Sequence, residues 1–155
     1  VAQVAVPPGQ AAPLARRTAL LHRLDHLNRL WHRSRQEGRI ALLLSDPVLR
    51  RPAIVFGTAL RHAARAPSAS GQHRRMHRIT RLIAARALRL RRAALLREHT
   101  GAESPASVFA RTDAIRSLER MAQHAERILH YGEIAAMDVP PRDAEWPEPG
   151  RDGAG

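Results

Sequence analysis

Residues 72–97 read QHRRMHRITRLIAARALRLRRAALLR, the longest stretch of the chain without proline, glycine or an acidic residue. Apolar side chains and arginines both recur in it at the three- and four-residue spacing of an α-helix. The apolar set that we expect to face inward is Met76, Ile79, Ile83, Leu90 and Ala94. The arginine set on a separate face is Arg74, Arg78, Arg81, Arg89 and Arg92. The stretch therefore predicts a long helix with one buried side and one basic side.

On the C-terminal side of this helix, Thr100-Gly101 predicts its end, and Ser104-Pro105 opens another long helix that we expect to stop at Gly132. Its predicted inward residues are Val108, Ile115, Leu118, Ala122, Ala125 and Leu129. On the N-terminal side, residues 66–71 (APSASG) predict a linker. Before it, Asp46 is a predicted N-cap and Pro47 a first-turn residue, for a helix that buries Leu49, Ile54, Phe56, Leu60 and Ala64.

A further helix is predicted from about Leu14, because four large residues follow spacings of four, three and four: Leu20, Leu24, Leu27 and Trp31. Gly38 is its predicted C′ residue. Residues 39–45 (RIALLLS) fit a short buried helix or a strand, and without a second strand candidate we favour the helix. The chain is thus predicted to be an all-α, antiparallel bundle of four to five helices. We expect Leu24, Leu27, Trp31, Ile79, Ile83, Leu90, Ile115, Leu118 and Leu129 in its core.

The predicted organisation has three parts: a flexible arm (1–13), a single helical domain (14–137) and a flexible acidic tail rich in proline and glycine (138–155). No run of 18 uncharged apolar residues exists, so we expect no membrane span, and the first residues lack the pattern of a secretory signal. The absence of cysteine excludes disulfides, zinc-thiolate sites and a cysteine nucleophile. We expect a cytoplasmic protein.

The charge is concentrated in the middle of the chain. All 26 basic residues are arginines, and the formal net charge is +12. Thirteen of these arginines lie in the basic central region, residues 47–97, which contains no aspartate or glutamate. A surface of one sign attracts a polyanion, so this block predicts nucleic acid as the partner.

The predicted nucleic-acid-binding residues are nine arginines of this region: Arg74, Arg75, Arg78, Arg81, Arg86, Arg89, Arg92, Arg50 and Arg51. The guanidinium fork suits phosphate because it can bond two oxygens at once. Phe56 is the only aromatic residue of the region, so base stacking is not expected and contacts should be to phosphate and sugar. The linker 66–71 is longer than the turn of a helix-turn-helix motif.

The sequence favours a non-catalytic helical subunit of a nucleoprotein complex that binds RNA or DNA backbone without sequence specificity, alongside other protein subunits. In size and helical content such a chain resembles the small helical subunit of CRISPR effector complexes and small helical ribosomal proteins, without a shared residue motif. The alternative is a helical adaptor or inhibitor that docks an acidic partner protein through its arginines. In the acidic tail, Trp146 is a predicted partner-binding anchor.

Two other patterns carry less weight. Arg17 and His22 have the R-x4-H spacing that resembles the catalytic motif of helical HEPN-type ribonucleases, but several such matches are expected by chance in a chain with 26 arginines and nine histidines. The pairs His22/His26 and His73/His77 have the i, i+4 spacing of metal ligands. We interpret these histidines as part of the positive surface and predict no catalytic residue, metal or cofactor.

Overall fold

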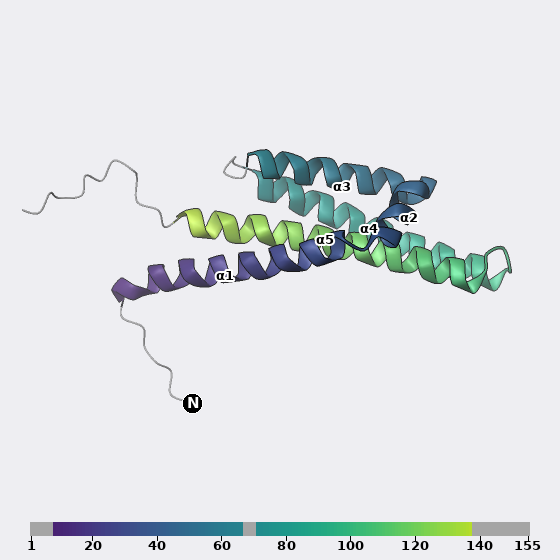
Figure 1. Cartoon of the computed structure of the whole chain (residues 1–155), viewed down its shortest axis with the longest axis horizontal. Helices are drawn as coiled ribbons and strands as arrows, with labels where there is room; N and C mark the ends of the chain where they lie inside the picture. Colours follow the sequence, from purple (N-terminus) through teal and green to yellow (C-terminus); the bar gives the residue numbers. More distant parts are fainter. Residues whose placement is uncertain (1–7, 67–70, 138–155) are drawn as a thin grey trace, which may run out of the picture.

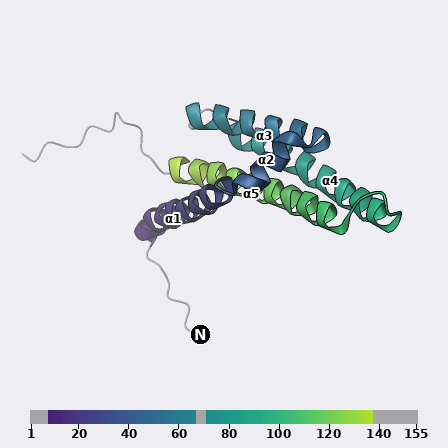
Figure 2. The ribbon, with the colours of Figure 1, turned by 45° about the vertical axis from the view of Figure 1, so that its right-hand side comes forward.

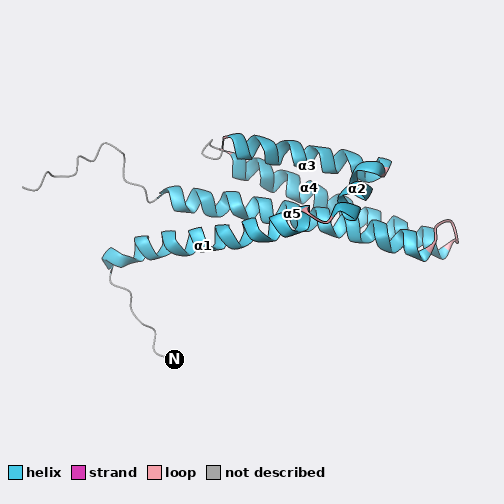
Figure 3. Cartoon of the chain, viewed as in Figure 1, coloured by secondary structure: helices cyan, strands magenta, loops and turns pink. Residues whose placement is uncertain are grey.

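The computed structural model describes residues 8–66 and 71–137 of the chain. In this part of the protein there are five helices and no strand: α1 (Pro8–Ser34), α2 (Glu37–Ser45), α3 (Pro47–Arg65), α4 (Gln72–His99) and α5 (Pro105–Met137) (Figure 1, Figure 3). The all-α class predicted from the sequence is confirmed. Residues 39–45 belong to α2, so the helical interpretation of that segment is also confirmed.

The centre of the bundle is the antiparallel hairpin of α4 and α5. Helix α3 runs antiparallel to α4 on one side of this hairpin, and α1 runs antiparallel to the second half of α5 on the other side (Figure 1, Figure 2). The short α2 joins α1 to α3 and packs on both α3 and α5. As a result, α3 and α1 flank the hairpin, and the outer side of α4 stays open.

The core is built around α5, whose buried residues include Ile115, Leu118 and Met121. Alanines of α4 and α5 fill much of the contact between these two helices, and such small side chains let the helices approach closely. Of the predicted core, Ile83, Ile115, Leu118 and Leu129 are buried, while Ile79 and Leu90 are partly buried and pack against it. Of the predicted inward residues of α3, by contrast, Ile54 and Ala64 are exposed.

The core prediction is wrong for α1. Leu24, Leu27 and Trp31 are 62%, 43% and 60% exposed, and Leu20 is exposed as well. The side of α1 that meets α5 is formed instead by the residues one position earlier in the helical repeat: Ala19, Arg23, His26 and Leu30. Both rows have helical spacing, so the periodicity identifies an apolar stripe without showing which side of the helix finds a partner.

Polar and aromatic contacts explain this choice of side. The Nδ1 atoms of His26 and His124 lie 3.1 Å apart, so one ring donates a hydrogen bond and the other accepts it. The ring of His22 stacks on Tyr131 with centroids 5.0 Å apart. Burial, with smaller contributions from His26 and nearby arginines, lowers the pKa of His124 to about 4. The hydrogen bond needs at least one neutral ring, and burial favours the neutral form of His124 at the contact between α1 and α5.

The helix ends also differ from the predictions. Helix α1 begins at Pro8, not near Leu14, because proline suits a first helical turn and the alanine-rich residues after it favour helix. The predicted arm is therefore helical over residues 8–13, and residues 1–7 lie outside the described part. Gly38 is inside α2 and is not a C′ residue, and α5 continues past Gly132 to Met137.

The predicted N-cap at Asp46 is confirmed. Its carboxylate accepts hydrogen bonds from the backbone N–H groups of Val48 (2.8 Å) and Leu49 (3.2 Å), and Pro47 occupies the first turn of α3. The other carboxylate oxygen accepts a 2.9 Å hydrogen bond from Nε of Arg111 on α5. Asp46, which is buried, thus fixes both the start of α3 and its position on α5.

Candidate nucleic-acid interface

The predicted arginine row lies on the outer side of α4. Its five members are all exposed: Arg74, Arg78, Arg81, Arg89 and Arg92. The buried residues of the same helix, among them Met76, Ile83 and Ala94, point toward α5 from the opposite side. From Arg74 to Arg92 the helix rises roughly 27 Å at ~1.5 Å per residue. The five arginines therefore form a row along one helix, on the side that faces away from the rest of the bundle.

The acidic residues of α5 leave this row without counter-charges. Glu133 pairs with His73 at 3.3 Å, Glu126 with His77 at 2.7 Å, and Glu119 with Arg91 at 2.8 Å. These three basic partners lie on the flank of α4 nearest α5, not on its outer side. Within residues 8–66 and 71–137, no member of the row forms an ion pair with a carboxylate. Its positive charge is therefore available to an external anion.

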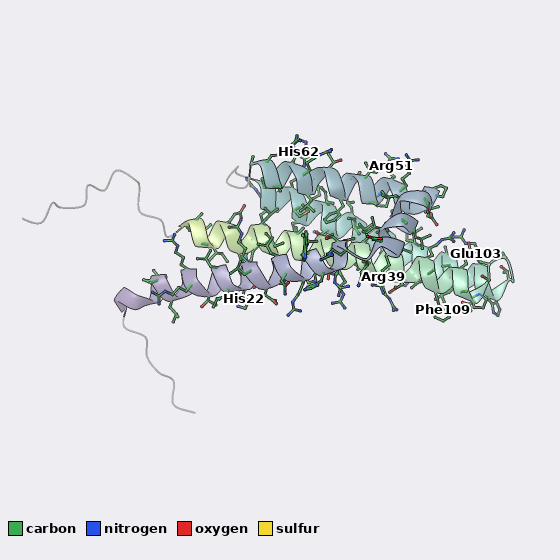
Figure 4. All side chains as sticks on the ribbon, viewed as in Figure 1. His22, Arg39, Arg51, His62, Glu103 and Phe109 are labelled. Carbon is green, nitrogen blue, oxygen red and sulfur yellow. The ribbon has the colours of Figure 1, made fainter. Side chains whose placement is uncertain are left out.

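The other four predicted arginines lie beside the row or on α3. Arg75 is exposed on α4, and Arg50 and Arg51 are exposed on α3, where Arg51 stands on the outer edge of the helix (Figure 4). Arg86 is half-buried, and its Nη2 donates a 3.4 Å hydrogen bond to the carbonyl oxygen of Val48. Arg51 and Arg86 line opposite walls of a shallow groove between α3 and α4. Arg86 therefore helps to hold α3 against α4. The other predicted arginines, Arg75, Arg50 and Arg51, lie on the side of the row nearest α3.

Exposed leucines accompany the arginines of α4, a feature that the analysis of the sequence missed. Leu82 and Leu88 are 64% and 46% exposed, and Leu95 and Leu96 are exposed near the end of the helix. Their spacing from Arg78, Arg81 and Arg89 could have placed them on the outer side. The outer surface of α4 is thus mixed, with a basic centre and apolar margins.

The histidines are distributed over two helix contacts. His22 and His26 face α5 from α1, whereas His73 and His77 contact glutamates of α5 from α4. Among the described residues, no group of three or more histidine, aspartate or glutamate side chains is placed to hold a metal ion. The two i, i+4 pairs therefore take part in helix packing.

The Arg17/His22 spacing and Trp146 were also singled out in the sequence. Arg17 and His22 are five positions apart on one helix, so their side chains point about 140° apart and do not converge. Trp146 lies outside the described residues.

None of the helices in the described part of the chain is long and apolar enough to cross a membrane. Comparison with models of known protein families, with curated protein sequences and with solved structures finds no match for this chain.

Proposed function

We propose that this protein is a non-catalytic subunit of a nucleoprotein complex and that the outer side of α4 binds the phosphate backbone of RNA or DNA. The observation that carries the proposal is the exposed row of five arginines, which has no carboxylate partner among the described residues. The proposal includes a cytoplasmic location and contacts with other protein subunits.

The chemistry of the row suits phosphate. Each guanidinium group offers a planar pair of donors that matches two phosphate oxygens. Phosphates of one strand are spaced by about 3.4 Å along a B-form duplex, so a row of roughly 27 Å can contact several of them. The row contains no aromatic side chain that could stack on bases, and most protein contacts of this kind go to phosphate and sugar. Binding is therefore expected to be similar for unrelated sequences.

The second candidate is an adaptor that docks an acidic protein on the same side of α4. The observation that favours it is the pair of exposed leucines beside the row, Leu82 and Leu88, since apolar contacts contribute to a protein interface and phosphate binding does not need them. The two candidates make different predictions about salt.

The experiment is a titration of the protein with duplex DNA, single-stranded DNA and RNA of unrelated sequences at several salt concentrations. Phosphate binding predicts a linear fall of log K with log salt, with a slope of about −0.9 for each neutralised phosphate of a duplex. Absence of binding to all three nucleic acids at low salt would contradict the proposal. The adaptor would then be the candidate to pursue.

A further inference from the structure

An apolar groove opens where α1, α2, α3 and α5 meet. Its volume is about 450 Å³, and its walls include Leu27 and Trp31 of α1, Leu44 of α2, Phe56 of α3 and Met121 of α5. No residue of α4 lines it, so it is separate from the arginine row. A groove of this size with apolar walls fits a bulky hydrophobic side chain.

The groove continues into the unpaired stripe of α1. Leu20 and Leu24 extend the apolar surface from Leu27 and Trp31 toward the N-terminal end of the helix, and all four are at least 40% exposed. A contiguous apolar surface rimmed by charged residues marks a binding site. Among residues 8–66 and 71–137, no segment covers this groove or the apolar stripe beside it.

We propose that the C-terminal segment of this same chain, residues 138–155, covers this surface and that Trp146 sits in the groove. This segment has five acidic residues against two arginines, a net charge of −3. Helix α1 has five arginines against Asp25, a net charge of +4. If a second copy of α1 bound here, two helices of charge +4 would repel each other. The acidic segment is complementary in charge to α1 and supplies the aromatic side chain of Trp146.

The length of the chain fits this path. Helix α5 ends at Met137, and the groove lies beside Met121, which is ~24 Å back along the helix at 1.5 Å per residue. Trp146 is nine residues beyond Met137, and an extended, proline-rich segment spans about 3.1 Å per residue, or ~28 Å. Since α1 is antiparallel to α5, a segment that turns back from Met137 runs alongside α1 and reaches the groove at Trp146.

Arginines of α1 stand along this path. Arg16 and Arg17 are exposed near the level of Met137. Arg23 lies against Gly132, with its Cζ 3.4 Å from where a β-carbon would stand, and its buried Nε has no hydrogen-bond partner in the described part of the protein. At the other end, the guanidinium of Arg35 lies 5.6 Å from the centre of the Trp31 ring at the groove. The acidic residues before and after Trp146 thus meet basic side chains.

The test uses the full chain with Trp31→Phe, which leaves Trp146 as the only tryptophan. The expected result is tryptophan emission at shorter wavelength than that of a synthetic peptide of residues 138–155, with no dependence on protein concentration. Adding Leu44→Glu or Leu27→Glu, both exposed positions in the groove wall, should remove the shift while the helical circular dichroism stays unchanged. Leu96→Glu is the matched control, since Leu96 is exposed on α4 away from the groove, and it should keep the shift.

Three results would overturn the proposal. Emission equal to that of the free peptide would mean that Trp146 is solvent-exposed and does not occupy the groove. A shift that grows with protein concentration would assign the groove to a second copy. A shift that survives both groove substitutions and disappears on replacement of Arg78, Arg81 and Arg89 by glutamine would place the segment on α4.

Discussion

Replacing Asp46 with alanine should lower the free energy of unfolding by about 2–4 kcal/mol, because this buried carboxylate has two structural roles. As the N-cap of α3 it accepts hydrogen bonds from two backbone N–H groups, and loss of such a cap costs about 1 kcal/mol. It also pairs with Arg111, which is only 23% exposed. In Asp46→Ala the Arg111 guanidinium loses one of its carboxylate partners, which should lower the free energy of unfolding by a further amount of about 1–3 kcal/mol.

The second role is limited by Glu103, which also accepts a hydrogen bond from Arg111. That hydrogen bond and the nearby Asp46 carboxylate raise the pKa of Arg111 above its usual value, and the Glu103 contribution remains when Asp46 is replaced. Asp46→Asn separates the two roles. Asparagine caps a helix as well as aspartate does but lacks the charge, so this variant should lose only about 1–2 kcal/mol.

The assay is urea denaturation followed by circular dichroism for the wild type and both variants. We expect a larger decrease in the free energy of unfolding for Asp46→Ala than for Asp46→Asn, with the same dependence on urea in all three proteins. Equal decreases would show that the cap contributes nothing measurable. A decrease below about 0.5 kcal/mol for Asp46→Ala would refute both roles, since that is the range of ordinary surface substitutions.

The core and the contact between α1 and α5 give two more predictions. Leu118→Ala should destabilise the protein by about 2–5 kcal/mol because Leu118 is buried, whereas Leu24→Ala should cost well under 1 kcal/mol because Leu24 is exposed. Equal losses of stability in urea denaturation would show that α1 is packed through its leucine stripe. The lowered pKa of His124 means that protonation favours the unfolded state, so stability is complete above about pH 6.5 and falls as the pH drops toward 4. The free energy of unfolding should fall between pH 7 and pH 5 by about 2 kcal/mol more in the wild type than in His124→Gln. Identical pH profiles of the two proteins would contradict a neutral, buried His124 beside His26.

The sequence was sufficient for features that depend on local chemistry. Asp46-Pro47 predicted a cap and a helix start because those residues satisfy backbone donors within two or three positions, and both are present. The α4 periodicity predicted which side is buried, since the apolar and arginine sets lie on opposite sides of one helix and only one can enter the core.

The sequence was not sufficient where two sides of a helix compete. On α1 the leucine stripe and the row of Ala19, Arg23, His26 and Leu30 have the same period. The contact of His26 with His124 joins residues 98 positions apart, and no local pattern encodes such a pairing. The groove was missed for the same reason, because its walls come from four helices.

Nucleic-acid binding by the triple variant Arg78→Gln, Arg81→Gln and Arg89→Gln tests most directly whether the outer side of α4 binds phosphate. Its matched control is Arg116→Gln, Arg120→Gln and Arg127→Gln, which removes the same charge from three exposed arginines of α5.

We expect the α4 variant to bind more weakly to every sequence, and the slope of log K against log salt to become shallower by about 2–3 units. The α5 variant should bind nearly as the wild type does. Equal losses of affinity in the two folded variants would mean that binding depends only on the total charge of the protein. Unchanged binding of the α4 variant would mean that the outer side of α4 does not contact nucleic acid.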